Sequence, residues 1–331
     1  MYDNAIFIGR FQIPHLGHLH IIESALKEAN TLTIIIGSAN APRSIRNPFY
    51  ANEREEMLRN AINPDLIHRI TFEYVEDSMY NDAKWINDVQ NIADKKSFSF
   101  NVLVGHRKDN TSYYLGLFPH WDNISFPNYK GINSTDIRND YFNLGIINPN
   151  VHPSTDRFLF NFAKTKDYQN IKNELDFINK YKKSWENAPY PPTFVTVDAC
   201  VVQGGHVLLV RRGASPGKGL FALPGGFINQ DERIEDAVLR ELREETGIKV
   251  PDPVLRGSII LRKVFDDPNR SSRGRTITHA HLIKLDDRDK LPKVKGADDA
   301  DKAFWYPFAK LRPNDFFEDH YFMSQNLIST I

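Results

Sequence analysis

The sequence has little of several features that define whole classes of protein. It has one cysteine, Cys200, which excludes an intrachain disulfide framework and a metal site built from a cluster of cysteines. Lys+Arg and Asp+Glu number 42 each, so the chain lacks the global positive field that collects nucleic acid. It also lacks a run of about eighteen apolar residues and an N-terminal basic segment followed by a long apolar one. We therefore expect a soluble cytoplasmic protein with no nucleic-acid or membrane partner.

What is present suits two domains. A chain of 331 residues exceeds one average domain, and its hydrophobic content of 41% is enough for buried cores. The segment Ala188–Pro192 contains three prolines, which cannot continue a helix and favour extended backbone. We predict a linker at 188–192 between a first domain at 1–187, which ends in a helical tail over Ser154–Glu186, and a second domain at 193–331.

Short apolar runs alternate with amphipathic segments through the first domain. This alternation predicts a parallel sheet with helices on both faces, in which ligands bind at the carboxyl ends of the strands. The predicted strands are Ala5–Gly9, Leu32–Gly37, Ile70–Val75 and Asn101–Gly105, and the predicted helices are Leu19–Ala29, Asn52–Ile62 and Lys84–Ala93.

The second domain predicts a mixed sheet. Phe194–Val202 and His206–Arg211 are rich in β-branched residues and flank Gly204-Gly205, a pattern that is typical of a hairpin. Further strands are predicted at Ser258–Val264 and Thr276–Leu285. An acidic helix is expected to pack against this sheet.

That acidic segment, residues 226–248 (GFINQDERIEDAVLRELREETGI), carries the densest chemistry in the chain. If residues 232–246 form one helix, Glu241, Glu244 and Glu245 lie at i, i+3 and i+4 and share one face. Crowded carboxylates repel unless a cation joins them, and a hard divalent ion, Mg²⁺ or Mn²⁺, suits oxygen ligands. A solvent-exposed acidic helix with pairs such as Arg240 and Glu244 is the alternative interpretation.

The same segment resembles the Nudix box. Every fixed position of that pattern is matched, from Gly226 through Glu232 to the run at 240–248. The resemblance implies a metal-dependent hydrolase of nucleoside diphosphates linked to another group, in which Glu241, Glu244 and Glu245 hold the metals. It also implies that Arg240 and Glu232 brace the loop–helix–loop. Gly247 is expected to end the helix. Either the box or the acidic loop 298–301 (DDAD) would supply the catalytic base, and the sequence does not choose between them.

A second site is predicted directly after the first strand, in residues 9–18 (GRFQIPHLGH). His15 and His18 are three apart near a helix N-terminus, so both imidazoles can face one pocket. Free backbone N–H groups and the positive end of the helix dipole favour an anion there. Together with Arg10, the two histidines would handle a phosphate without a nucleophile. For the pair alone, structural or surface histidines are the alternative.

Residues 9–18 resemble the (H/T)xGH signature of the nucleotidyltransferase superfamily. They are most similar to the GRFQPxHxGH form of the archaeal-type nicotinamide mononucleotide (NMN) adenylyltransferases, with the proline displaced by one position to Pro14. The resemblance implies that His15 and His18 are catalytic. It implies further that the substrate-binding residues include Gly9, Arg10, Phe11 and Gln12.

Two later segments resemble the same enzymes. The stretch from Ser38 to residues 44–49 (SIRNPF) looks like the family's loop after the second strand, which implies that Ser38 binds substrate and that Arg46 reaches the triphosphate. Residues 132–138 (INSTDIR) resemble the second signature of the family. There, Ser134 and Thr135 would cap a helix and offer N–H groups to a phosphate, and Arg138 would add a forked positive charge. An ordinary N-cap followed by a surface arginine is the alternative.

The substrate itself is indicated by residues 77–85 (DSMYNDAKW), which resemble the nicotinamide-recognition segment of these enzymes. Asn81 would bind the substrate and Trp85 would stack on the cationic pyridinium ring. A core tryptophan on an amphipathic helix is the alternative for Trp85. Three residues that follow a predicted strand, Gly105, His106 and Asp109, would contact the nucleotide.

Taken together, the two resemblances identify the chain as a member of the bifunctional NMN adenylyltransferase/Nudix hydrolase family. The implied fold class is α/β, with a Rossmann-like nucleotidyltransferase domain followed by an α+β Nudix fold. The implied first reaction joins NMN and ATP into NAD and pyrophosphate, with His15, His18, Arg46 and Arg138 as catalytic residues. The implied second reaction is Mg²⁺-dependent hydrolysis of a dinucleotide. ADP-ribose, cleaved to AMP and ribose 5-phosphate, is its expected substrate because the other domain makes NAD.

Two alternatives stay open. The Nudix half would be a ligand sensor if it did not cleave its ligand, although it keeps three metal carboxylates and no basic recognition helix follows it. The first domain would act on another phosphate or mononucleotide if Trp85 did not recognise nicotinamide. The sequence also leaves open the number of metals, coupling between the sites and the oligomeric state, a homo-oligomer included.

Overall fold

The structure is a computed structural model that describes residues 1–95, 100–106, 115–295 and 300–331. The chain forms two compact units, Met1–Leu175 and Asp176–Ile331. The boundary between them falls within helix α6 (Lys166–Lys183), ahead of the proline-rich segment at 188–192. The limits 1–187 and 193–331 stay a prediction. In the described part of the chain, no helix is long and apolar enough to cross a membrane.

A parallel sheet of five strands forms the centre of the first unit, in the order β3-β2-β1-β4-β5. The four predicted strands and their parallel pairing are confirmed. A fifth strand at the sheet edge was not predicted, because its sequence DNIS is polar and mostly exposed. The strands are β1 (Tyr2–Gly9), β2 (Ala29–Ile36), β3 (Ile70–Tyr74), β4 (Asn101–Gly105) and β5 (Asp122–Ser125).

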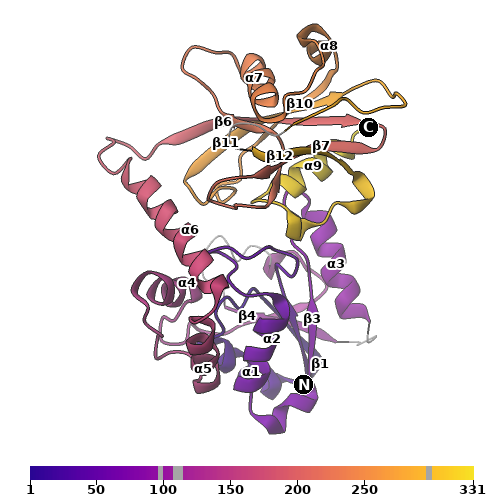
Figure 1. Cartoon of the computed structure of the whole chain (residues 1–331). Helices are drawn as coiled ribbons and strands as arrows, with labels where there is room; N and C mark the ends of the chain where they lie inside the picture. Colours follow the sequence, from indigo (N-terminus) through magenta and orange to yellow (C-terminus); the bar gives the residue numbers. More distant parts are fainter. Residues whose placement is uncertain (96–99, 107–114, 296–299) are drawn as a thin grey trace. The chain divides into compact units, whose positions relative to one another are not determined.

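Helices cover both faces of this sheet, as predicted (Figure 1). The apolar sides of α1 (Leu16–Glu28) and α2 (Ala51–Ala61) pack on one face, and α3 (Asp82–Asp94) packs on the other. The chain runs outward from β1 to β3 and then returns to place β4 beside β1. Ligands of open α/β sheets bind outside the carboxyl ends of the strands at such a reversal.

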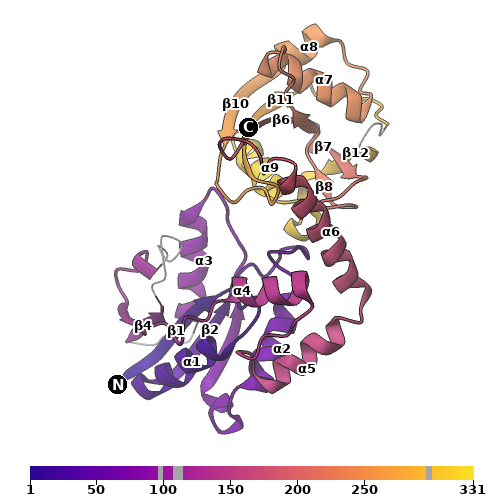
Figure 2. The ribbon, with the colours of Figure 1, turned by 90° about the vertical axis from the view of Figure 1, so that its left-hand side faces the viewer.

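A second core of the first unit lies beside the sheet. It is formed by α2, α4 (Ser134–Asn139), the π-helical turn Asp140–Leu144, α5 (Pro153–Phe162) and the first half of α6. Helix α5 packs against α2 (Figure 2). This core anchors the loop between β2 and α2, whose role is taken up below.

The second unit is a mixed sheet in the order β10-β11-β6-β7-β12, in which only β11 and β6 run parallel. The predicted hairpin of β6 and β7 is confirmed, and Gly204 and Gly205 turn it with φ of 53° and 70°. The strands are β6 (Thr193–Gln203), β7 (His206–Arg212), β8 (Phe221–Ala222), β9 (Gly225–Phe227), β10 (Ile259–Phe265), β11 (Arg275–Lys284) and β12 (Ala300–Pro307).

Helices α7 (Ile234–Thr246) and α8 (Asp252–Gly257) cover one face of this sheet, while α9 (His320–Ile328) lies on the other side (Figure 1). Helix α7 begins at residue 234, so the helix predicted from Glu232 is too long by two residues: Arg233 is the N-cap, and Glu232 lies in the loop before it. Gly247 ends the helix with φ 56°, as predicted.

The single cysteine reports on the core of the second unit. Cys200 lies on β6 and is fully buried, and burial raises the pKa of its thiol to about 12. Because the thiolate is the reactive form, we expect the native protein not to react with an aromatic disulfide reagent at about pH 8. In the denatured protein, Cys200 should react with this reagent and release one equivalent of its coloured aromatic thiol. Native protein that reacts as fast as a free thiol would contradict the placement of Cys200.

Candidate active sites

The predicted histidine pair lies together at the carboxyl end of β1. His15 is the N-cap residue of α1, and its backbone N–H donates to Nδ1 of His18 at 3.2 Å. The two rings stack with centroids 3.7 Å apart. Phe11 packs edge-on against His18 with a centroid distance of 5.0 Å. The loop after β1 therefore fixes both the place and the orientation of the His18 ring.

Hydrogen bonding and burial define the chemical state of His18. Burial, together with the nearby His15, holds the pKa of His18 well below its usual value of 6.5, so the ring is neutral at pH 7. Nδ1 accepts the His15 N–H, which leaves the ring proton on Nε2. His18 thus offers one N–H donor beside a helix N-terminus, where backbone N–H groups also favour a phosphate oxygen.

Arg138 is bound to the segment after β1 and has two other arginines nearby. Burial, together with the charges of Arg10 and Arg46, lowers the pKa of Arg138 to about 10, so both of these guanidinium groups lie within electrostatic reach of Arg138. Arg138 is 9% exposed and donates to the carbonyl oxygen of Gln12 and to Oγ1 of Thr135, the latter at 3.4 Å. Like charges held together favour an anion between them, and forked guanidinium groups suit phosphate oxygens.

Two residues that were predicted to bind substrate have buried side chains instead. Phe11 is 2% exposed and packs between Phe7 and His18. Gln12 is 1% exposed: its Nε2 donates to the Phe49 carbonyl at 2.8 Å and its Oε1 accepts the Phe49 N–H at 3.1 Å. These contacts support the loop after β1, and substrate contact by Phe11 and Gln12 stays a prediction. Gly9 also serves packing, because a Cβ there would lie 2.8 Å from the Phe11 ring.

The helix cap predicted at residues 134–135 is wrong by one residue. Asn133 is the N-cap of α4, and its side chain accepts the Asp136 N–H at 3.0 Å. Ser134 Oγ donates to the carbonyl of Ile13 at 3.1 Å, while Thr135 Oγ1 accepts from Arg138. The two hydroxyls therefore tie α4 to the loop after β1 and orient Arg138.

Arg54 was given no role in the sequence analysis, although it organises the site. It is fully buried on α2 and donates to the carbonyl oxygens of Arg10 at 2.6 Å, Gly37 at 2.7 Å and Ser38 at 3.1 Å. Arg10 follows β1 and Gly37 follows β2, so one guanidinium joins the two strand ends. An arginine on the apolar face of a predicted helix is the signal that would have revealed it.

The remaining nucleotide-contact predictions fall at the carboxyl ends of β2 and β4. Ser38 is 3% exposed with φ 50°. Gly105 ends β4 and accepts the Phe126 N–H at 2.8 Å, and the Nδ1–H of His106 donates to the Phe126 carbonyl at 3.0 Å. Asp109 lies outside the described residues.

The surroundings of Trp85 are compatible with both interpretations of this residue, stacking on nicotinamide and packing in the core. It is half-buried, and its ring packs 6.0 Å from that of Phe118, which in turn stacks on Trp121 at 4.5 Å. Asn81 is the exposed N-cap of α3 and accepts the Lys84 N–H at 3.0 Å. Trp85 thus contributes to the core while part of its ring stays accessible, and its stacking on nicotinamide stays a prediction.

In the second unit, Arg240 on the acidic helix α7 forms ion pairs with three glutamates. It donates to Glu232 at 2.6 and 2.9 Å, to Glu241 at 2.7 Å and to Glu244 at 2.8 Å. Glu232 also accepts the Asn229 N–H at 2.6 Å, and chiefly the bonds from Arg240 lower the pKa of Glu232 to about 2. The predicted brace between Arg240 and Glu232 is confirmed.

The three candidate metal ligands differ in their surroundings. Glu244 is exposed, whereas Glu241 and Glu245 are half-buried. Glu245 accepts the Gly225 N–H at 2.9 Å, and burial raises the pKa of Glu245 to about 8, with the charges of Glu241 and Asp198 adding to the effect. Burial also raises the pKa of Glu241. Burial therefore disfavours the ionised forms of Glu241 and Glu245.

These glutamates fit a divalent cation by their chemistry. In the described ranges, no three His, Cys, Asp or Glu side chains lie close enough together to hold a metal ion, and Glu241 and Glu244 are paired with Arg240. Carboxylate oxygens are nevertheless the ligands that hard divalent cations prefer. Because burial disfavours the ionised forms of Glu241 and Glu245, a cation bound there would offset the cost of their negative charge.

A buried polar network beside the box was not found from the sequence. Asp198 on β6 accepts from Thr278 Oγ1 at 2.5 Å and lies 3.6 Å from Nδ1 of His320, and burial raises the pKa of Asp198 to about 7. His320 accepts the N–H of Leu223, just before the box, at 3.1 Å. No motif joins these residues, which come from four separate segments. Of the loop 298–301, predicted as a source of the base, Asp298 and Asp299 lie outside the described residues, as does the side chain of Asp301.

Comparison with known proteins adds independent findings for both units. Residues 6–140 match the cytidylyltransferase-like family model, and residues 192–327 match the NUDIX domain model. The chain is 35% identical over 176 residues to the nicotinamide/nicotinic acid mononucleotide adenylyltransferase of Acinetobacter baylyi, covering 52% of this chain and 93% of that protein. It is 34% identical over 117 residues to the ADP-ribose pyrophosphatase of Methanocaldococcus jannaschii, covering 35% of this chain and 63% of that protein.

Solved structures match the whole chain. A bifunctional NMN adenylyltransferase/ADP ribose pyrophosphatase from Francisella tularensis is 39% identical, with a TM-score of 0.93 over 99% of both chains. A crystal structure of such an enzyme from the same organism, complexed with AMP and a manganese ion, is 38% identical, with a TM-score of 0.92 over 100% of this chain and 99% of that one.

Proposed function

The chain belongs to the family of bifunctional NMN adenylyltransferase/ADP-ribose pyrophosphatases, and we propose that it is an enzyme that carries one of these activities in each unit. The observation that carries the proposal is that Arg10 and Arg46 lie within electrostatic reach of Arg138, which donates to Gln12 in the segment between β1 and the neutral His18. This arrangement suits a triphosphate, and the Nudix box of the second unit supplies the groups for a diphosphate.

In the first unit, a phosphate oxygen of NMN attacks the α-phosphorus of ATP, a new P–O bond forms, and pyrophosphate leaves. Phosphoryl transfer needs positioning and charge stabilisation more than covalent chemistry. The Nε2–H of His18 and the guanidinium groups of Arg46 and Arg138 donate to the phosphate oxygens as charge develops on them. His15 fixes the His18 ring, and Arg54 holds the strand ends that carry the donors.

In the second unit, we propose that Glu241, Glu244 and Glu245 hold Mg²⁺, with Mn²⁺ as a substitute. When bound, the cation would offset the charge of a diphosphate and lower the pKa of a water molecule. The protein's own part is to keep the carboxylates in place, through Arg240 and through the Gly225 N–H that holds Glu245. The proposed substrate is ADP-ribose, with AMP and ribose 5-phosphate as products. The names of the M. jannaschii and F. tularensis relatives support this choice.

The test uses the purified full chain. It is incubated with ATP and NMN, and separately with ADP-ribose, NAD, NADH and dinucleoside polyphosphates, with and without Mg²⁺ or Mn²⁺, and the products are separated by chromatography. We expect NAD and pyrophosphate from the first mixture, and AMP from ADP-ribose only when a divalent cation is present. If no compound in the panel is cleaved, the ligand-sensor alternative holds. If nicotinic acid mononucleotide or pantetheine phosphate replaces NMN with higher kcat/KM, the substrate assignment is wrong.

A further inference from the structure

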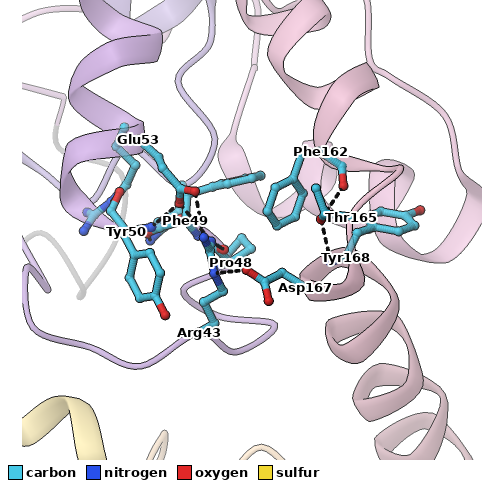
Figure 3. Close-up of polar contacts among 11 residues, drawn as sticks. Arg43, Pro48, Phe49, Tyr50, Glu53, Phe162, Thr165, Asp167 and Tyr168 are labelled. Carbon is cyan, nitrogen blue, oxygen red and sulfur yellow. Dashed lines mark hydrogen bonds and ion pairs between the residues drawn. The ribbon is translucent and has the colours of Figure 1, made fainter.

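The loop between β2 and α2 is closed at its base by Arg43 (Figure 3). Nη1 of Arg43 donates to the carbonyl of Pro48 at 2.6 Å, across the base of the loop. Inside the loop, the backbone N–H groups of Ser44 and Asn47 each donate to the other residue's carbonyl, at 3.2 and 3.1 Å. The exposed Arg46 therefore lies at the tip of a small closed loop with little freedom of its own.

Arg43 is itself held from several directions (Figure 3). Its guanidinium meets Glu53 of α2 with two bonds of 2.7 and 2.8 Å, and its Nε lies 3.0 Å from Oδ2 of Asp167 in the first turn of α6. The group also lies over the ring of Tyr50 at 3.9 Å and near that of Phe162 at 5.2 Å. Only a planar, forked cation satisfies a carboxylate bidentately while stacking on aromatic rings, so lysine would not replace it.

The far side of the loop is anchored as well. Glu53 accepts the Tyr50 N–H at 2.7 Å, and Gln12 holds the backbone of Phe49 with two hydrogen bonds. These contacts attach the end of the loop to α2 and to the segment after β1. Arg43 joins the beginning of the loop to this fixed end through its bonds to Pro48 and Glu53.

The tip needs such an anchor because it faces like charge. Arg46 lies within electrostatic reach of Arg138, as does Arg10. Before a polyphosphate binds, three guanidinium groups at one place repel one another, so a loose loop would carry Arg46 away from the other two. The contacts of Arg43 oppose this movement and keep the site arranged before the substrate arrives.

We propose that Arg43 is a positioning residue for adenylyl transfer, which acts through Arg46 by holding the loop that presents it to the triphosphate. The proposal rests on the adenylyltransferase function proposed above. Arg43 makes its own contacts with Pro48, Glu53 and Asp167, so its effect on the substrate passes through the loop.

The first experiment compares Arg43→Lys with a matched Arg59→Lys control in the full-length protein. Arg59 is an exposed arginine of α2 that pairs with Glu55 at 2.6 Å and lies over the ring of Phe72 at 4.3 Å, so the chemical change is the same but away from the loop. We expect Arg43→Lys to lower kcat/KM for ATP and to weaken ATP binding by about 10- to 100-fold. The KM for NMN and the hydrolysis of ADP-ribose should stay at wild-type values, as should every value for Arg59→Lys.

A double-mutant cycle separates positioning from a merely structural role. If Arg43 acts through Arg46, the pair Arg43→Lys with Arg46→Gln should bind ATP no more weakly than Arg46→Gln alone. Additive losses, or wild-type ATP affinity in Arg43→Lys, would overturn the proposal. Should Arg43→Lys fail to fold, Asp167→Asn removes a single contact of Arg43 and should show a smaller loss in the same direction. Wild-type protein that binds ATP but makes no NAD would refute the proposed function, while the binding cycle would still decide the role of Arg43.

Discussion

We expect His18→Ala to lower the rate of adenylyl transfer by about 10²- to 10³-fold and to leave ADP-ribose hydrolysis at the wild-type rate. Removing one fixed donor from a charge-stabilising site has an effect of this size. The neutral ring offers an Nε2–H whose direction is set by the bond from the His15 N–H and by the packing of Phe11. Alanine removes the donor, and water in its place would lack that fixed orientation.

The measurement is the steady-state rate of NAD formation with ATP and NMN varied separately. His20→Ala is the matched control, because His20 lies on the same helix and its ring stacks on Tyr129 at 4.8 Å. It should stay within about twofold of wild type. Because the pKa of His18 lies well below 6.5, the rate should show no step from this group above pH 7. If His18→Ala formed NAD at the wild-type rate, the assignment of His18 as a catalytic residue would be wrong.

The second large effect is expected from Glu245→Gln, which should reduce ADP-ribose hydrolysis on the order of 100-fold or more while NAD synthesis continues. A glutamine oxygen still accepts the Gly225 N–H, so the local fold is kept. The amide has no charge with which to hold a divalent cation. The variant therefore tests cation binding separately from folding.

Thermal unfolding gives a readout that does not depend on activity. The pKa of Glu245 is raised from 4.5 to about 8, so above pH 4.5 the folded state binds a proton more tightly than the unfolded state, and this carboxyl opposes folding as the pH rises. At about pH 8 without cations, Glu245→Gln should melt no lower than the wild type. Adding Mg²⁺ or Mn²⁺ should raise the Tm of the wild type only, because a cation that binds the folded state stabilises it.

Glu235→Gln is the matched control for these measurements. Glu235 lies on the same helix but pairs with Arg256 at 3.0 Å and with Arg262 at 2.7 Å, and it is not one of the three proposed metal ligands. This variant should keep both hydrolysis and the cation-induced rise in Tm. If Glu245→Gln showed the same rise as the wild type, the assignment of this glutamate to a cation would be refuted.

Patterns among residues close in the sequence were enough to predict the first sheet, the acidic helix and the approach of the two histidines. The alternation of short apolar runs with amphipathic segments predicted a parallel sheet with helices on both faces, and β1, β2 and β4 lie in such a sheet. The spacing of Glu241 and Glu245 placed them on one side of a helix, and Gly247 ended that helix as expected. The spacing of His15 and His18 predicted that their side chains lie close together, because residues three apart at a helix N-terminus point to the same side.

Tertiary structure alone decided which groups support these sites. Arg54 joins the ends of β1 and β2, Arg43 closes the loop of Arg46, and Asp198 reaches His320. Each contact joins segments whose approach depends on the packing of whole elements, and neither periodicity nor motif spacing carries that information. The charged residues that face a ligand follow local spacing along the chain, whereas the residues that hold them in place depend on side-chain packing between distant segments, which only the folded structure shows.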